Sequence, residues 1–156
     1  MTSVHPATDR EVLAIRSVVA PRGQVFKAWT DPVHLARWWG PNGFTNTFHE
    51  FDPRAGGAWR FVMHGPDGRD YPNESVFVEV VEPELVVLDH LSNPRFRLEA
   101  DFAEDGGGTQ VTFRQIFESA EMCERLKTIV VGANEQNLDR LEAELARMGE
   151  PEAAGS

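Results

Sequence analysis

The spacing of apolar residues changes once along this chain, at Ser119. Before Ser119, short segments in which apolar and polar residues alternate are separated by clusters of Gly, Pro, Asp and Asn, which is typical of β-strands joined by turns. After Ser119, apolar residues recur every three or four positions as far as Met148, which predicts one long amphipathic helix. The predicted strands span residues 11–19, 44–51, 58–64, 73–81, 85–90, 95–103 and 110–117.

Two short helices are predicted between the first two strands. Pro21 has the backbone angle that suits a first helical position, and apolar residues follow it at helical spacing as far as Trp29. Asp31 can accept hydrogen bonds from free backbone N–H groups, and Pro32 fills a position that needs no donor, so a second helix is predicted to begin there. The Gly-Pro pair at residues 40–41 ends that helix.

Consecutive strands joined by short turns predict an antiparallel sheet, and such a sheet must bury one apolar face. The long helix is the large apolar partner that remains for it. We therefore expect an α+β fold in which a curved antiparallel sheet of about six to seven strands wraps around a long C-terminal helix, with a space lined by aromatic residues between them. Residues 10–149 are expected to form a single domain between disordered ends at residues 1–9 and 150–156.

Several short motifs follow one another in an order that points to one family. In chain order they are Trp38-Trp39, Gly56-Gly57, Pro66-Asp67-Gly68 with Tyr71, Val78-Glu79-Val80 with Glu82-Pro83, Gly107-Gly108-Thr109 with Val111-Thr112-Phe113, and Gly132 with Gln136-Asn137-Leu138-Asp139-Arg140-Leu141. Over roughly residues 10–148 the chain resembles the activator of Hsp-90 ATPase homologue-like branch of the START-like superfamily, also called the SRPBCC or polyketide cyclase superfamily. The resemblance implies a helix-grip fold.

The resemblance also implies a class of functions. Related members of the superfamily bind lipids, sterols or polyketides, which implies a small hydrophobic or amphipathic ligand in an internal cavity. The branch name implies a chaperone partner. The eukaryotic namesake has an additional N-terminal chaperone-binding domain, and we expect no room for one in this chain.

Alternation along the predicted strands indicates which side chains face the helix. On the strand at residues 58–64 the inward residues are Trp59, Phe61 and Met63, and on the strand at residues 73–81 they are Val76, Val78 and Val80. On the strands at residues 85–90 and 110–117, the polar residues His90 and Gln115 share the inward face with apolar neighbours. Asn134 does the same on the long helix. A polar group that points inward costs free energy unless it is paired. The candidate ligand-binding residues are therefore Trp39, Phe44, Trp59, Phe61, Met63, His90, Phe113, Gln115, Gly132 and Asn134.

Each of these residues also has a purely structural interpretation. The three polar residues could hydrogen-bond to the backbone or to one another, and aromatic residues at strand spacing are more often core than pocket. Trp39 and Phe44 flank a Gly-Pro-Asn-Gly turn, where they could gate a cavity mouth. Gly132 lies in mid-helix, which favours either the close approach of a ligand or a local kink.

Three functions follow from these residues and from the resemblance. The first is a carrier or sensor of a small hydrophobic or amphipathic ligand. The second is a cavity enzyme of the cyclase, dehydratase or hydrolase type, with His64, His90 or Glu74 as proton-transfer groups and no catalytic residue identified. The third is a co-chaperone-like interaction domain. The five histidines are dispersed, and no motif for a metal, nucleotide or other cofactor is found, so none is expected.

Composition narrows the environment and the partners. The single cysteine, Cys123, excludes an intrachain disulfide and fits a reducing compartment. The first residues have neither a basic start nor an apolar run, and no segment approaches the length of a membrane-spanning helix, so we expect a cytoplasmic protein without membrane insertion. The sequence leaves open whether the chain forms a homodimer.

The formal net charge of −10 predicts that the protein does not bind nucleic acid specifically, because the chain must overcome repulsion from every phosphate. We expect no mobility shift of labelled DNA or RNA at submicromolar protein concentration. A shift that weakens as salt is added would contradict this prediction.

Overall fold

The computed structural model describes residues 9–149. Apart from Asp9, the disordered ends predicted at residues 1–9 and 150–156 lie outside the described residues. The elements in chain order are β1 (Glu11–Val18), α1 (Arg22–Thr30), α2 (Pro32–Trp38), β2 (Thr45–Phe51), β3 (Ala58–His64), β4 (Asp70–Val81), β5 (Leu85–His90), β6 (Phe96–Asp105), β7 (Gly108–Phe117) and α3 (Ala120–Gly149).

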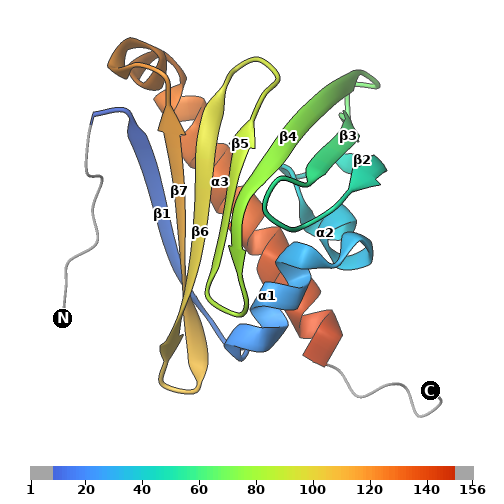
Figure 1. Cartoon of the computed structure of the whole chain (residues 1–156), viewed down its shortest axis with the longest axis vertical. Coiled ribbons are helices and arrows are strands. Elements are labelled where there is room, and N and C mark those ends of the chain that lie inside the picture. Colours follow the sequence, from blue (N-terminus) through green and yellow to red (C-terminus); the bar gives the residue numbers. More distant parts are fainter. Residues whose placement is uncertain (1–8, 150–156) are drawn as a thin grey trace.

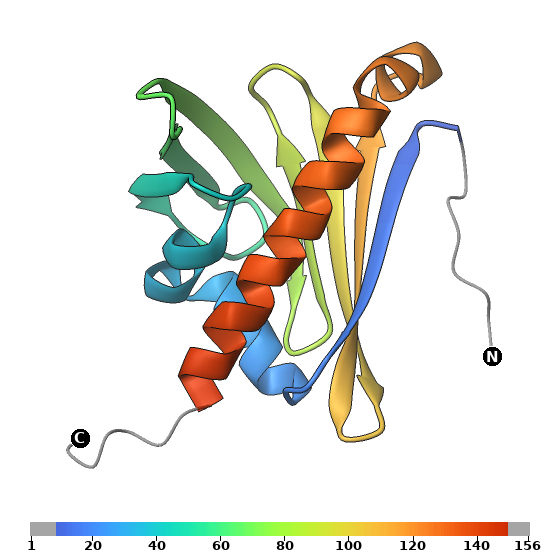
Figure 2. The ribbon, with the colours of Figure 1, turned by 180° about the vertical axis from the view of Figure 1, so that it is seen from behind.

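The seven strands form one antiparallel sheet in the order β1-β7-β6-β5-β4-β3-β2 (Figure 1). Helix α3 runs obliquely across one face of the sheet, which Figure 2 shows from the helix side. Helix α1 contacts α3 and β6, whereas α2 contacts β2 and α3. This arrangement confirms the predicted α+β helix-grip fold with two short helices after the first strand.

Both short helices begin near the residues that the sequence indicates. Asp31 is the N-cap of α2: its carboxylate accepts a hydrogen bond from the backbone N–H of Val33 at 2.9 Å, and Pro32 occupies the first turn. Pro21 was expected to be the first residue of α1 but lies one position earlier, because its extended backbone makes it the N-cap.

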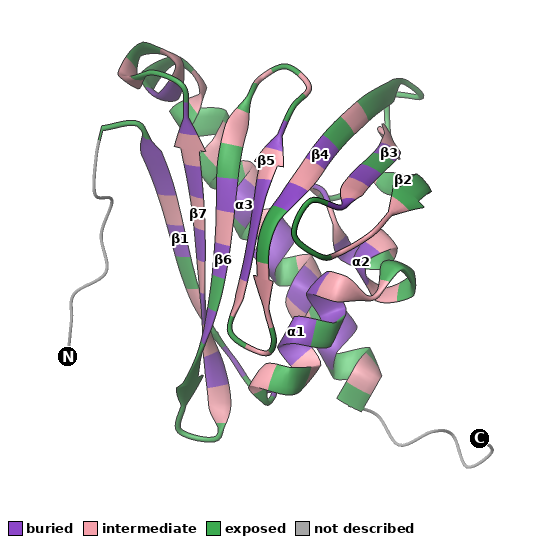
Figure 3. Ribbon diagram, in the orientation of Figure 1, coloured by how far each residue is buried: buried purple, intermediate pink, exposed green. Residues whose placement is uncertain are grey.

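The main hydrophobic core lies between the sheet and the three helices (Figure 3). On β7, every second residue from Thr109 to Phe117 is buried, which is the alternation expected of a strand with one face toward the core. Helix α3 contributes Leu138, Leu141 and Leu145 to the same core. The predicted inward positions on β7 are therefore confirmed, including the polar Gln115.

The predicted inward face of β4 is wrong in its first half. Ser75 and Phe77 are buried there, whereas Val78 is exposed. A β-bulge between Phe77 and Glu79 explains the difference, since one extra residue reverses which positions point inward. Only beyond the bulge does Val80 face the core, as the alternation of valines predicts.

Arg16 fastens the edge strand β1 to α3. Its guanidinium donates to the carboxylates of Glu135 at 2.7 Å, Asp139 at 2.8 Å and Glu142 at 2.6 Å. Burial alone would lower the pKa of Arg16, but the hydrogen bonds to Asp139, Glu142 and Glu135 outweigh it and raise the pKa. The three carboxylates lie on one side of α3, so this contact sets how the helix rotates against β1.

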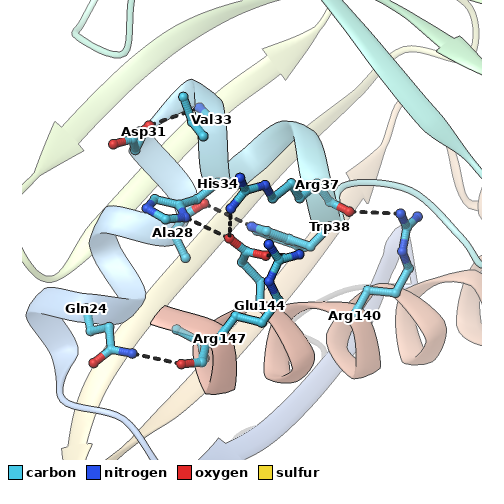
Figure 4. Close-up of polar contacts among 11 residues, drawn as sticks. Gln24, Ala28, Asp31, Val33, His34, Arg37, Trp38, Arg140, Glu144 and Arg147 are labelled. Carbon is cyan, nitrogen blue, oxygen red and sulfur yellow. Dashed lines mark hydrogen bonds and ion pairs between the residues drawn. The ribbon is translucent and has the colours of Figure 1, made fainter. Parts of the chain in front are cut away.

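Glu144 joins α3 to α2 through a buried carboxylate (Figure 4). The side chain is only 3% exposed and accepts from His34 Nδ1 at 2.7 Å and from Arg37 at 3.3 Å, with Arg147 at 3.8 Å. Next to it, Gln24 of α1 donates to the backbone carbonyl of Leu145 at 2.9 Å. The C-terminal half of α3 is therefore bonded to both short helices.

Removing the partners of Glu144 should destabilise the fold more than neutralising Glu144 itself. A buried carboxylate that loses its hydrogen-bond donors is costly, so His34→Ala with Arg37→Ala, which leave Arg147 at 3.8 Å from Glu144, should lower the free energy of unfolding by about 3 kcal/mol. Glu144→Gln keeps the shape and should cost about 1 kcal/mol. Urea unfolding measures both, with Arg54→Ala at an exposed ion pair as the control. Equal losses in the two variants would contradict the prediction.

Candidate functional site

A pocket of about 480 Å³ lies between the sheet and α3. It is bounded by strands β3 to β7, by the middle of α3, and by the segment between α2 and β2, which we call the rim loop (residues 39–44). Nine of the ten predicted site residues line this pocket: Trp39, Phe44, Trp59, Phe61, Met63, His90, Phe113, Gln115 and Asn134.

Aromatic rings form one wall of the pocket and continue into the core behind it. Trp39 lies 5.4 Å from Trp59 and 6.3 Å from Phe113 between ring centroids, and it is nearly parallel to Phe113. Trp59 stacks on Phe61 at 4.3 Å. Trp39 also contacts Trp29 of the core at 5.7 Å. The wall is therefore fixed from behind by packed rings and presents flat apolar surface to the pocket.

Three amide side chains, Gln115, Asn134 and Asn137, form what we call the polar corner of the pocket. All three are buried. Asn134 Nδ2 donates to Gln115 Oε1 at 2.9 Å, which links α3 to β7. Asn137 lies one turn further along α3, and its Oδ1 accepts from the backbone N–H of Gly40 at 3.0 Å. The interpretation in which the predicted polar residues pair with one another therefore holds for Gln115 and Asn134.

His90 also lines the pocket and is the last residue of β5. Its Nδ1 is 2.9 Å from the carbonyl oxygen of Pro94, and its Nε2 is 2.7 Å from the side-chain amide of Asn73. Burial lowers the pKa of His90 and favours the neutral ring. Both neighbouring atoms are oxygens that accept, since Asn73 Nδ2 donates to the carbonyl of Tyr71, so the neutral ring can donate to only one of them at a time. Because both nitrogens have protein neighbours, His90 joins β4, β5 and the β5–β6 turn at the pocket edge.

Arg140 of α3 holds the rim loop in place. One terminal nitrogen donates to the carbonyl oxygens of Trp39, Gly40 and Pro41, and the other to those of Arg37 and Phe44, the Arg37 contact being drawn in Figure 4. The distances run from 2.7 to 3.4 Å. The planar guanidinium suits this role because it spreads several donors in one fixed fork.

The backbone of the rim loop needs glycine where it approaches the sheet. Gly40 has a φ of 103°, and a Cβ atom there would lie 2.8 Å from Met63 Cε. Gln136 accepts from the backbone N–H of Asn42 at 3.0 Å. Three residues of the Gln136–Leu141 motif, Gln136, Asn137 and Arg140, therefore bind the rim loop. Its Asp139 instead binds Arg16 of β1.

The predicted position of Gly132 beside the polar residues is wrong. Gly132 is exposed, does not line the pocket, and has open space where a Cβ would be. Helix geometry explains this, since two residues correspond to about 200° of rotation, so Gly132 faces away when Asn134 faces inward. Its neighbour Ala133 lines the pocket instead.

The sequence prediction also missed several residues that line the pocket. Ser75 and Asn73 were missed because the valines of β4 were assigned to the inward face. Asn137 was noted only as part of a motif, although its spacing of three from Asn134 places it on the same helix face and could have identified it.

The proposed proton-transfer groups are not gathered in one place. His90 lines the pocket, but Glu74 lies in a separate shallow depression with His49 and Arg60. His64 does not line the pocket; its ring nitrogens are 2.8 Å from Asp70 and 2.7 Å from Thr47. Within residues 9–149, no group of three His, Cys, Asp or Glu side chains is placed to hold a metal ion.

A sequence model of one protein family matches most of the chain. The family is described as activator of Hsp90 ATPase homolog 1-like protein, and the match spans residues 19–146. The chain belongs to this family. The matched segment runs from the end of β1 to the last turns of α3, so it includes the pocket and the rim loop. Among curated protein sequences, no match is found.

Solved structures share the fold. A protein from Nitrosomonas europaea superposes with a TM-score of 0.84 at 18% identity, covering 92% of this chain and 98% of that one. A Rhodobacter sphaeroides protein has a TM-score of 0.84 at 21% identity, covering 95% and 100%. The AHSA1 protein of Silicibacter pomeroyi has a TM-score of 0.71 at 20% identity, covering 88% and 99%. At these identities the likeness concerns the fold alone.

None of the helices in the described part of the chain combines the length and apolar character needed to cross a bilayer.

Replacing Arg140 should loosen the rim loop. Arg140→Met keeps the apolar stem but removes one donor from five backbone carbonyls, of which Trp39 keeps Asn46 Nδ2 and Pro41 keeps the N–H of Phe44. The free energy of unfolding should therefore fall by about 3 kcal/mol. In the folded variant, the amide protons of Gly40 and Asn42 should exchange faster with solvent. Arg125→Met, at an exposed position on the same helix, is the control. Unchanged exchange at both amides would show that Arg140 does not hold the loop.

Proposed function

We propose that the protein binds one small hydrophobic or amphipathic molecule in the pocket between the sheet and α3, as a carrier or sensor. The observation that supports this most directly is the pocket itself, about 480 Å³ in volume and walled by Trp39, Trp59, Phe61 and Phe113. That volume lies within the range of small-molecule sites, which are mostly apolar with a few polar groups.

The physical basis of binding would be the removal of apolar surface from water. Each Å² of apolar surface that leaves water contributes about 25 cal/mol, so even a modest ligand gains several kcal/mol. The aromatic wall is packed from behind by the core and needs little reordering when a ligand enters, which lowers the entropic cost of binding. The polar corner and His90 would then orient the ligand.

The alternatives remain predictions that no structural observation favours. A cavity enzyme would need a proton-transfer group free to act, and both ring nitrogens of His90 have protein neighbours. A chaperone partner is suggested by the family name alone. The proposed compartment is the cytoplasm, where a free thiol such as that of Cys123 stays reduced. Burial raises the pKa of that thiol.

Two adjacent helix positions offer a matched test of pocket binding. Ala133 lines the pocket and Gly132 does not, so the same side chain can be introduced at either position. Ala133→Phe should weaken binding of the neutral fluorescent probe N-phenylnaphthylamine about tenfold or more by occupying the pocket. Gly132→Phe should leave the dissociation constant within about twofold, because its side chain points to solvent.

Both variants should keep the circular dichroism spectrum and cooperative unfolding of the parent protein. Absence of saturable probe binding to the parent would overturn the proposed function. Equal weakening by the two substitutions would show that the probe binds elsewhere.

A further inference from the structure

The polar corner carries more hydrogen-bonding groups than the protein itself uses. Building on the pocket-binding function proposed above, we propose that the ligand is uncharged and carries a carbonyl-type acceptor beside a hydrogen-bond donor, as a carboxamide, a lactam or a hydroxy-ketone does. The groups left free on Gln115, Asn134 and Asn137, and the charges around them, support this class of ligand.

Asn137 presents a donor to the pocket. The backbone N–H of Gly40 can only donate, so the side chain of Asn137 must turn its oxygen toward Gly40, as the 3.0 Å contact shows. Its Nδ2 is then left with two N–H groups that have no partner among the described residues. An acceptor on the ligand is the group that satisfies them.

Gln115 and Asn134 together present one donor and one acceptor. Asn134 Nδ2 donates to Gln115 Oε1, which leaves Gln115 Nε2 and Asn134 Oδ1 without a partner within the described chain. If both amides were turned over, the free groups would exchange places, but one N–H group and one oxygen would still remain. These free atoms are not sealed inside the protein, because each residue lines the pocket. Buried amide groups of this kind favour a ligand that pairs with both.

The charges around the pocket favour an uncharged ligand. Of the described residues that line it, Asp70 is the one with a formal charge at neutral pH, and its carboxylate is bonded to His64. His90 is kept neutral by burial, and the two terminal nitrogens of Arg140 donate to rim-loop carbonyls. A carboxylate placed in the pocket would lose its hydration without a cation to replace it.

The test compares three probes of nearly the same shape: anthracene carboxamide, ethylanthracene and anthracene carboxylate. We expect the parent protein to bind the carboxamide about tenfold more tightly than either of the others, measured by fluorescence titration. The carboxamide can accept from the free N–H groups and donate to the free oxygen, whereas ethylanthracene can do neither and the carboxylate adds an unpaired charge.

Gln115→Met with Asn134→Leu removes the paired amides while keeping the side-chain volumes similar. In this double variant Asn137 keeps its N–H groups but the ligand's donor loses its partner, so the preference for the carboxamide over ethylanthracene should fall about threefold or more, and ethylanthracene itself should bind at least as tightly as before. Phe113→Leu is the matched control: it trims the apolar wall and should weaken both probes equally, leaving the preference unchanged.

The outcomes separate the two proposals. If none of the three probes binds, pocket binding itself fails. If ethylanthracene binds but the carboxamide shows no preference, or if the preference is undiminished by loss of the two amides, pocket binding stands and the assigned ligand class is overturned. Tightest binding of the carboxylate would overturn the assignment of an uncharged ligand.

Discussion

The fork of hydrogen bonds from Arg140 to the backbone of the rim loop is the contact on which the pocket depends. The guanidinium donates to five carbonyl oxygens, and burial lowers its pKa. It thereby fixes the backbone of Trp39, whose ring belongs to the aromatic wall, and the backbone of Phe44, which lines the pocket from the rim loop. A lysine could not replace it, since an ammonium offers three donors from a single nitrogen.

One side of helix α3 both binds the rim loop and presents polar groups to the pocket. Asn134, Asn137 and Arg140 follow one another at intervals of three along α3, so successive side chains are rotated by about 60° and lie on one broad side of the helix. Arg140 and Asn137 bond the rim loop, whereas Asn134 bonds β7 through Gln115. Because each of these protein partners uses only one side of an amide, the other side is left free to face the pocket.

Local pattern was enough to predict most of the fold. Alternation identified the strands, and on β7 it placed even the polar Gln115 correctly, because that strand has no irregularity. The change of period at Ser119 located α3 within one residue of its first position. On β4 the same reasoning failed at the bulge beside Phe77, because the alternating valines around that position do not indicate that one residue is unpaired.

The sequence predicted the pocket residues whose position follows from a single strand, helix or turn, but not the contacts between such elements. Nine predicted residues reach the pocket because they lie on the inward faces of strands, on α3 or beside the Gly-Pro turn. The prediction for Gly132 was wrong because its rotation around the helix relative to Asn134 was not considered, although the spacing of the two residues in the sequence gives that rotation. The contact of His90 with Pro94 and the fork of Arg140 join segments whose distance depends on the folded loops, so no spacing in the chain could have predicted them.

Helix α3 is held unevenly along its length. From Asn134 onward it carries six buried residues and the contacts to Arg16, His34 and the rim loop, whereas none of its side chains from Glu124 to Ala133 is buried, and Ile129 is 72% exposed. Segments with few tertiary contacts open at lower free energy than the molecule as a whole. One continuous helix thus contains two regions of different local stability. The less stable region, from Glu124 to Ala133, ends at the residues of α3 that line the pocket. Fraying of that region can widen access to the polar corner while the sheet and the rim loop stay intact.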